Sequence, residues 1–223
     1  MKFKNKPLRI ACDGESASGK SFASKAIGSK YYLFVLNSGF AYRYASFLII
    51  KYRPKKIVPF LKKKFKNLNY KEISGRNLHT QEISNHVVNL AKKKRVRNII
   101  KSFQKKIIKK YPRIVVEGRD AASSILKKNY LCAFYFTCSL KVSSYRRWLD
   151  LNKKIPLEEV KKSLKNRTLQ DKKRRQNPLI KVANAVVIRT HLLTKKQMIQ
   201  KMQKEIDRRL LLKYGSNIKT RKK

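Results

Sequence analysis

The sequence predicts an α/β protein, a three-layer sandwich in which a five-stranded parallel sheet is flanked by helices. Short β-rich runs alternate with helical stretches along the chain, and this alternation is typical of a parallel sheet with helices on its faces. Residues 131–137 are almost wholly apolar, as a central parallel strand should be. With 223 residues, of which 42% are hydrophobic, the chain is long enough for one sizeable core. We therefore expect a single domain over residues 1–223.

Short apolar runs supply the expected strands of this sheet. In chain order they cover residues 8–12, 32–36, 114–116, 131–137 and 185–188. A glycine-rich loop follows the first run, Ser38 follows the second, and Glu117 follows the third. Open parallel sheets bind ligands at the carboxyl ends of their strands. We therefore expect the functional residues at these three strand ends.

Helical stretches lie between the strands. They cover residues 21–30, 41–51, 80–91, 95–109, 142–151, 156–173 and 194–212. The second of them is apolar enough to be buried and is stopped by Pro54. In the stretch from 95 to 109, apolar side chains recur at helical spacing. Pro156 suits a helical first turn.

Two segments have no such pattern. Residues 52–77 are lysine-rich, are interrupted by Pro59 and Gly75, and show no clear periodicity, so we interpret them as an insertion. The last residues, 214–223, are polar and basic, and we expect them to form a disordered tail.

The strongest functional signal is the pattern G-x-x-x-x-G-K-S after the first strand. Its glycines let the backbone approach an anion closely, so that successive N–H groups point at phosphate oxygens. The following helix adds its positive N-terminal end. Lys20 can then reach the β- and γ-phosphates of a nucleoside triphosphate, and the Ser21 hydroxyl is placed to ligate Mg²⁺. The pattern predicts a P-loop that binds ATP through Gly14, Glu15, Ser16, Ala17, Ser18, Gly19, Lys20, Ser21 and Phe22.

Charged side chains at the next two strand ends complete the predicted site. Arg43 and Arg119 are candidates to clamp a second phosphate, because the guanidinium fork matches phosphate oxygens bidentately. A surface ion pair is the alternative for either arginine, although the chain has only 12 acidic residues. We assign Glu117 to the metal through a bound water, while Ser21 and the phosphates take the inner positions. A structural pair with a lysine is the alternative for Glu117.

The composition is strongly basic, with 58 Lys and Arg against 12 Asp and Glu and a net charge of +46. Such a field attracts polyanions, but the lysine runs are scattered, which favours a solvated surface and at most non-specific nucleic-acid binding. Cys12, Cys132 and Cys138 form no C-x-x-C pair and are interpreted as buried small hydrophobes in a reducing cytoplasm. The three histidines have no ligand-like grouping. No apolar run reaches the length of a signal peptide or a membrane span, so we expect no membrane partner.

Several blocks, in order, resemble bacterial cytidylate kinases, which are nucleoside monophosphate kinases of the P-loop group. The blocks are residues 10–21, 36–43, 80–82, 95–97, 117–120, 167–174 and 178–179. The loop alone would indicate only a nucleotide-binding fold, whereas the ordered set selects this family. The resemblance implies phosphorylation of CMP and dCMP by ATP with Mg²⁺, in an enzyme that we expect to be a monomer. It also implies a monophosphate-binding insertion over residues 52–92 and a helical lid over residues 152–177.

The resemblance implies roles for single residues as well. The residues expected around the phosphate of the bound monophosphate are Ser38, Tyr42, Arg43 and Arg119. Those expected near its ribose, its base or the lid are Asp120, Arg167, Asp171, Arg97 and Arg174. Two lid-side arginines expected close to ATP are Arg146 and Arg147. The expected catalytic set is therefore Lys20, Arg43, Arg119 and Arg146.

The spacing of Arg167, Asp171 and Arg174 places all three on one face of a helix, and an ordinary intrahelical ion pair is the alternative explanation of that trio. The chain also departs from the family pattern. Val88 stands where the family has a serine that contacts the base, and Asn85 or Asn89 could replace that contact. Glu15 stands at a usual proline.

Two other functions remain open from the sequence. The same scaffold could phosphorylate UMP or a non-nucleotide metabolite, or the chain could be an RNA- or ribosome-associated P-loop protein whose charge is its function. Salt separates these alternatives, because nucleic-acid binding weakens steeply with ionic strength whereas turnover of ATP and CMP should persist. A phosphate acceptor is already anionic near neutral pH, so the kinase reading requires no general base, and the sequence offers no obvious one.

Overall fold

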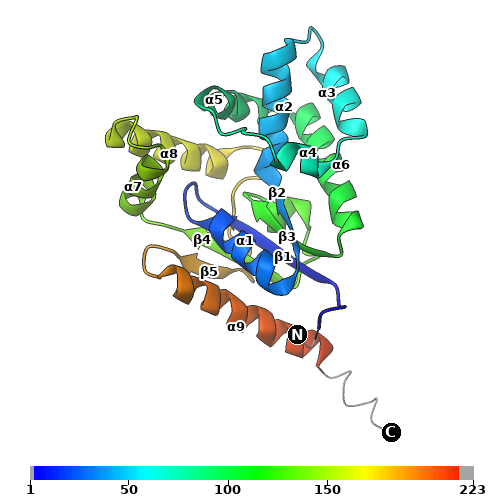
Figure 1. Ribbon diagram of the computed structural model, residues 1–223, viewed down its shortest axis with the longest axis vertical. Helices are drawn as coiled ribbons and strands as arrows, with labels where there is room; N and C mark the ends of the chain where they lie inside the picture. The colour runs from blue at the N-terminus through cyan, green and yellow to red at the C-terminus, as the bar shows by residue number, and fades with distance from the viewer. Residues whose placement is uncertain (1–2, 216–223) are drawn as a thin grey trace. The chain divides into compact units, whose positions relative to one another are not determined.

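The computed structural model describes residues 3–215, which form two compact units (Figure 1). The first unit contains the residues up to Leu36 and those from Pro112 onward, and the second contains Asn37–Tyr111. Among the described residues, no helix is both long and apolar enough to cross a membrane.

The first unit is built on a five-stranded sheet, as predicted. Its strands are β1 (Leu8–Gly14), β2 (Phe34–Asn37), β3 (Arg113–Gly118), β4 (Cys132–Thr137) and β5 (Val186–Arg189). Their order across the sheet is β2-β3-β1-β4-β5, and β1 pairs in parallel with both β3 and β4. Because β1 lies in the middle, the loop that follows it emerges between the ends of β3 and β4.

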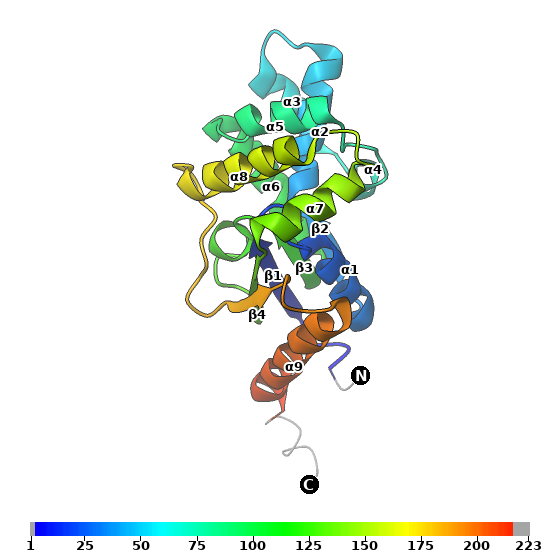
Figure 2. The same cartoon turned by 90° about the vertical axis from the view of Figure 1, so that its left-hand side faces the viewer.

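Helices complete the first unit. They are α1 (Lys20–Tyr31), a π-helical turn η1 (Ala121–Ile125), α7 (Leu140–Asp150), α8 (Leu157–Lys173) and α9 (Lys195–Tyr214). Figure 2 shows the same helices from the side. Helix α8 begins one residue after Pro156, which is its N-cap and not part of its first turn. Helix α9 reaches Tyr214, the first residue of the predicted tail, and residues 216–223 lie outside the described residues.

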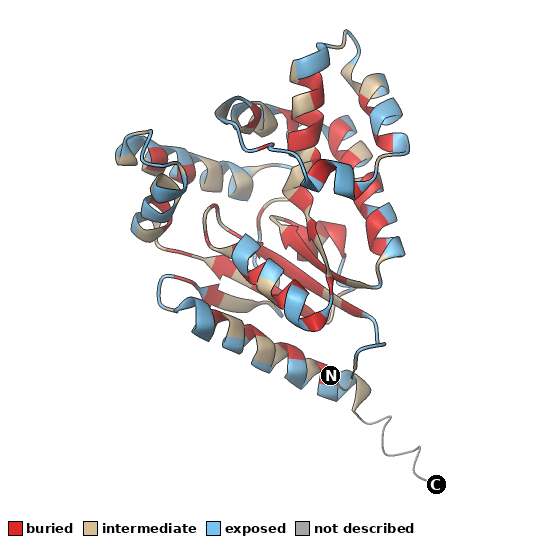
Figure 3. Cartoon of the chain, in the orientation of Figure 1, coloured by how far each residue is buried: buried red, intermediate tan, exposed pale blue. Residues whose placement is uncertain are grey.

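The core of this unit lies between the sheet and helices α1 and α9. Alternate side chains of β1 point into it, and they meet Phe134 and Phe136 of β4. Helix α9 contributes a stripe with a spacing of four residues, which is the spacing of one helical face: Met198, Met202, Ile206 and Leu210. The strands are accordingly buried, while the outer faces of α1 and α9 are exposed (Figure 3). Cys12, Cys132 and Cys138 are buried and free, as the sequence indicates.

The second unit is helical. Its elements are α2 (Ser38–Tyr52), α3 (Ile57–Lys66), α4 (Tyr70–Ser74), α5 (Gln81–Leu90) and α6 (Lys94–Lys110). The prediction of no regular pattern over residues 52–77 is wrong, because both α3 and α4 lie there. Pro59 is the third residue of α3, in the first turn, where a missing N–H costs no helical hydrogen bond. Leu61 and Phe65 form the buried face of α3. The many lysines around them obscure the helical spacing of these apolar residues in the sequence.

We expect Phe65→Ala to destabilise the second unit by about 3–5 kcal/mol, because the cavity left by a buried aromatic ring closes only in part. Phe65 is buried and its ring stands edge-on to that of Phe103, with 5.5 Å between ring centroids. Urea unfolding followed by circular dichroism measures the effect. The control is Phe60→Ala, on the same helix but only partly buried, which should cost clearly less. Equal losses for the two variants would contradict this account of the core.

Candidate active site

The loop between β1 and α1 has the backbone of a phosphate cradle. Gly14 has a φ of 151°, and a Cβ there would clash with the carbonyl oxygen of Phe136 on β4, so the position demands glycine. Gly19 is left-handed, with a φ of 80°, and is the N-cap of α1. Two hydrogen bonds fix the turn between them: Glu15 N–H donates to Phe136 O (3.0 Å), and Ser18 Oγ donates to Glu15 O (2.9 Å).

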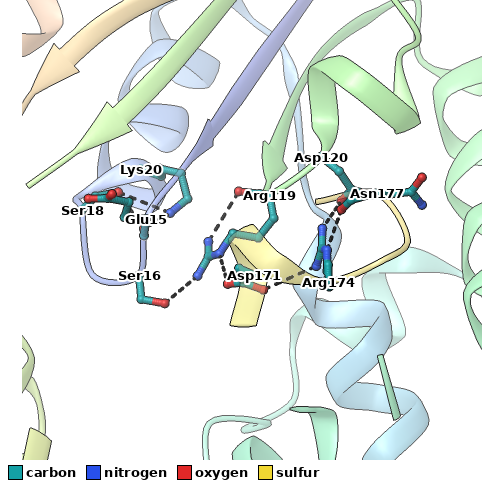
Figure 4. Close-up of polar contacts among 10 residues, drawn as sticks. Glu15, Ser16, Ser18, Lys20, Arg119, Asp120, Asp171, Arg174 and Asn177 are labelled. Atoms are coloured by element: carbon teal, nitrogen blue, oxygen red, sulfur yellow. Dashed lines mark hydrogen bonds and ion pairs between the residues drawn. The ribbon is translucent and has the colours of Figure 1, made fainter. Parts of the chain in front are cut away.

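Lys20 lies inside this loop and not on the surface (Figure 4). Its Nζ donates to Glu15 O at 2.6 Å and to Ser18 Oγ at 3.4 Å, and the residue is only 7% exposed. Burial, and next the charge of Arg119, lower the pKa of Lys20 well below that of an ordinary lysine. A cation held in this way gains strongly from an anion placed beside it, because little solvent screens the interaction.

The hydroxyl of Ser21 donates to Glu117 Oε1 at 2.9 Å. The two residues come from the start of α1 and the end of β3, and the pairing of Cys12 with Glu117 in the sheet places the acid beside β1. Glu117 is 4% exposed. A hydroxyl and a carboxylate are the hard oxygen donors that Mg²⁺ prefers. Within residues 3–215, no group of three or more His, Cys, Asp and Glu side chains forms a separate metal site.

Arg119 joins three elements at the end of β3. Its Nη2 donates to Ser16 Oγ in the loop at 2.9 Å, and its Nε donates to Asp171 Oδ2 on α8 at 2.7 Å (Figure 4). Burial alone would raise the pKa of Asp171, but the charges of Arg119 and Arg167 hold it below its usual value. The guanidinium therefore has an ionised partner at neutral pH.

Arg174 pairs with two acids. Its Nη2 lies 3.5 Å from Asp120 Oδ1 and its Nη1 lies 3.4 Å from Asp171 Oδ1 (Figure 4). Asp171 thus makes the intrahelical pair that the spacing allowed, but it also pairs with Arg119 from another element. Asp171 and Arg174 therefore belong to a network at the end of β3, while Arg167 acts on this network through its charge, which helps to lower the pKa of Asp171.

The two arginines of α7 that the family resemblance places near ATP differ in their surroundings. Arg146 donates two hydrogen bonds to Thr190, one to the threonine hydroxyl (3.3 Å) and one to the threonine carbonyl oxygen (3.1 Å). Thr190 in turn has its methyl group 3.9 Å from the place where a Cβ of Gly19 would lie, so Arg146 is anchored next to the phosphate loop. Arg147 is half-buried. Phe22 points outward, with 43% of its surface exposed, and Lys195 Nζ lies 5.0 Å from its ring centroid.

The second unit holds the other predicted residues. Arg43 on α2 is buried and donates to Leu78 O at 2.9 Å and to Ser84 Oγ at 3.0 Å. The guanidinium of Arg97 on α6 lies over the ring of Tyr42, 5.5 Å from its centroid. Ser38 is buried at the start of α2. Arg43 and Arg119 belong to different units, so their joint grip on one phosphate stays a prediction.

Three buried polar residues were given no role in the sequence analysis: Asp13 and Thr190 in the first unit and Gln104 in the second. Asp13, in β1, is 4% exposed and accepts hydrogen bonds from the N–H groups of Ala121 (2.7 Å) and Ala122 (2.8 Å) in η1. Gln104 donates to Ser38 O at 3.1 Å. Of the three, only Asp13 has a recognisable sequence signal, because it is a charged residue at the end of an apolar strand. A buried carboxylate needs a hydrogen-bond partner, so this position indicates a structural role.

We expect the stability of the protein to depend on Asp13 between pH 4 and pH 6. Burial raises the pKa of Asp13 from 3.8 to about 6. A carboxyl group whose pKa is raised by folding favours the folded state at low pH, and that contribution is lost as the pH rises through the folded pKa. The free energy of unfolding of the wild type should therefore fall relative to that of Asp13→Asn between pH 4 and pH 6. Urea titrations at several pH values measure this difference, and parallel pH profiles would contradict it.

A parallel sheet has the order β2-β3-β1-β4-β5, and a phosphate loop follows its central strand, so the fold and the loop define a P-loop nucleotide-binding protein. Solved structures with similar folds include TT1252 from Thermus thermophilus, with a TM-score of 0.52 and 13% identity over 92% of this chain and 99% of that one. An uncharacterized protein from Eubacterium ventriosum also has a TM-score of 0.52, with 14% identity over 91% of this chain and 99% of that one. These likenesses concern the fold alone.

Sequence comparison then narrows the class. The cytidylate kinase family model matches residues 10–208. A cytidylate kinase of Clostridium botulinum (strain Langeland) is 30% identical over 87% of this chain and 95% of that protein. The cytidylate kinase of Aquifex aeolicus is 27% identical over 91% of this chain and 97% of its own length. The chain belongs to the cytidylate kinase family, and it is a nucleoside monophosphate kinase that uses ATP to phosphorylate CMP and dCMP.

Proposed function

We propose that the protein transfers the γ-phosphoryl group of ATP in line to the phosphate of CMP or dCMP, with Mg²⁺ bound beside Ser21 and Glu117. The observation that carries this proposal is the position of Lys20. Its ammonium group is buried inside the loop whose backbone N–H groups would bind the phosphates, and Arg119 adjoins the same loop. Alignment and charge neutralisation are the two requirements of phosphoryl transfer that a protein can meet in this way.

On the donor side, the phosphates of ATP would lie along residues 14–22, with Lys20 at the β- and γ-phosphates. Lys20 now donates to Glu15 O and Ser18 Oγ, and it would exchange these neutral acceptors for phosphate oxygens. Arg146 and Arg147 would add positive charge from α7. The anchoring of Arg146 to Thr190 supports this role, since it orders the guanidinium near the start of α1.

The donor set at the strand ends fits a magnesium ion. Ser21 Oγ would be an inner ligand together with phosphate oxygens, and Glu117 would hold a bound water. The ion would supply charge neutralisation at the transferring group. Glu117 and Ser21 already share a hydrogen bond, so their oxygens are in place before nucleotide binds.

On the acceptor side, CMP would be bound by residues of both units. Those of the first unit are Arg119, Asp120, Arg167, Asp171 and Arg174, and those of the second are Ser38, Tyr42, Arg43 and Arg97. The ion-paired network around Arg119 supports the first group, because paired guanidinium groups are already ordered when a phosphate arrives. The contact between Arg97 and Tyr42 supports the second. Base reading by Asn85 or Asn89 in place of Val88 is part of this proposal.

The phosphate of CMP is its own nucleophile, so no side chain has to remove a proton. What the chain must do is hold two polyanions together and keep water away from the γ-phosphoryl group. A lid over residues 152–177, closing on the donor, would exclude that water. We further propose that residues 1–223 act as one kinase domain, with the monophosphate-binding insertion at 52–92, as a monomer in the cytoplasm. The three free cysteines are consistent with a reducing compartment.

A coupled assay of ADP release tests the proposal. With ATP and Mg²⁺, we expect rapid ADP release with CMP or dCMP, much slower release with UMP or AMP, and almost none without an acceptor. Chelation of the metal should abolish turnover. Activity that is highest with UMP, or that is independent of any monophosphate, would overturn the assignment of the acceptor. Repeating the assay at moderate salt separates turnover from nucleic-acid binding, which salt would weaken steeply.

A further inference from the structure

Glu15 is an unexpected residue for a phosphate loop. Its side chain brings a negative charge to a loop built to receive phosphates, and nothing in the phosphate chemistry requires it. The structure shows where that charge is directed. Glu15 Oε2 accepts a hydrogen bond from Thr137 Oγ1 at 3.0 Å and faces the N–H of Cys138 at 3.5 Å, both at the end of β4. The carboxylate is therefore turned out of the cradle, toward the neighbouring strand.

The other carboxylate oxygen of Glu15 pairs with α8. Lys172 Nζ donates to Glu15 Oε1 at 2.8 Å, and the two side chains are 45% and 18% exposed. Burial alone would raise the pKa of Glu15, but the hydrogen bonds from Lys172 and Thr137 lower it, so the carboxylate is charged at neutral pH. The hydrogen bond to Glu15 likewise raises the pKa of Lys172. The pair is thus a true ion pair between residues far apart in sequence.

Lys172 follows Asp171 directly in the last turn of α8. Asp171 pairs with Arg119, and Arg119 donates to Ser16, the residue after Glu15. The end of α8 is consequently tied to the phosphate loop twice, once through Lys172 and Glu15 and once through Asp171 and Arg119. A helix end fixed at two adjacent residues loses the freedom to rotate, which orders the Asp171 carboxylate against Arg119.

We propose that Glu15 is a positioning residue which, by pairing with Lys172, holds the last turn of α8 on the phosphate loop and so places Asp171 and Arg119 for the acceptor. The inference rests on the proposed function, because it assigns Arg119 to the acceptor phosphate. It also gives Lys172 a second task, which is to cancel the negative charge that Glu15 brings close to the phosphates of ATP.

Replacing Lys172, Glu15 or both should change KM for ATP and KM for CMP in different ways. Lys172→Met leaves Glu15 charged and without its lysine partner, so KM for ATP and KM for CMP should both rise, by about twofold to fivefold each. Glu15→Gln keeps an acceptor for Thr137 but lacks the charge, so only KM for CMP should rise. In the double variant, KM for ATP should return to the wild-type value while KM for CMP stays as high as in either single variant. The value of kcat should change less than either KM.

The matched control is Lys173→Met, which removes the adjacent, exposed lysine of the same helix and should change neither KM. Because the Glu15–Lys172 pair is partly exposed, the defect of Lys172→Met in KM for ATP should also shrink as salt increases. Calorimetric titration of ATP into each variant, without acceptor, measures the same charge effect independently of turnover.

The outcomes separate this inference from the proposed function. If the wild type does not phosphorylate CMP, the proposed function fails. If the wild type is active but Lys172→Met behaves like Lys173→Met, or if the effects of the two single variants on KM for ATP simply add in the double variant, the positioning role of Glu15 is overturned and the proposed function stands.

Discussion

Replacing Lys20 by methionine lowers kcat about 100- to 1,000-fold, the loss expected when one preorganised cationic donor at the transferring group is removed. Methionine matches the length of the lysine stem and suits a buried position, so the variant should fold at least as stably as the wild type. Stability can even rise, because Lys20 is buried and its pKa is strongly lowered by burial. Steady-state kinetics with saturating ATP and CMP measure the loss.

The control for Lys20→Met is Lys25→Met, which replaces an exposed lysine on the same helix. The pH dependence offers a further check. Since the pKa of Lys20 is lowered in the free protein, the ammonium group is lost at a lower pH than in an ordinary lysine, and phosphate binding must restore the proton. ATP affinity of the wild type should thus fall as pH rises through that lowered pKa, and that of Lys20→Met should not. Near-normal turnover in Lys20→Met would refute the role of Lys20.

The parts of the fold that the sequence predicts well are those where local pattern and tertiary role agree. Strand β1, the phosphate loop and α1 were predicted within two residues, because a buried strand, two glycines with special backbone angles and a helix start all leave local marks. The capping residue Thr80 marks the start of α5 in the same way, since its side chain accepts from Ile83 N.

The failures have the opposite cause. Helix α3 has a buried face of few residues, and its many lysines made the segment look irregular. Asp13 was missed because its partners are backbone N–H groups, and their direction depends on the π-helical turn η1, which has no recognisable sequence pattern. The ion pair between Glu15 and Lys172 joins residues that are 157 positions apart. It could not be predicted, because nothing in the local sequence marks either side chain as different from the many other charged residues.

For the site, the sequence located the strand ends correctly but could not give the contacts made there. Glu117 illustrates this limit. Its place at the end of β3 follows from the strand pattern, whereas its hydrogen bond to Ser21 depends on the register between β1 and β3. Arg119 is a second case, because nothing in the local sequence indicates that it donates to both Ser16 and Asp171. The roles of these residues toward bound nucleotides remain predictions.

Arg119→Ala is expected to raise KM for CMP about 10- to 150-fold, since a hydrogen bond to a charged group contributes about 1.5–3 kcal/mol. Arg119 is the side chain that links the phosphate loop to α8, so its loss also leaves Asp171 without its strongest partner. The rise in KM for ATP should be smaller, because the cradle of residues 14–21 and Lys20 remain intact. Initial rates over a grid of ATP and CMP concentrations separate the two constants.

Arg119→Lys sharpens this test, because lysine keeps the positive charge but cannot donate to Ser16 and Asp171 with one planar fork. If the fork positions the acceptor, Arg119→Lys should recover only a small part of the lost CMP affinity. If charge alone matters, it should recover most of it. The control is Arg175→Ala, which removes an exposed arginine just beyond α8 and should leave both constants near their wild-type values. A phosphate bound beside Arg119 would lose affinity when the guanidinium group is removed. An unchanged dependence on CMP concentration in Arg119→Ala would therefore exclude Arg119 from the acceptor site.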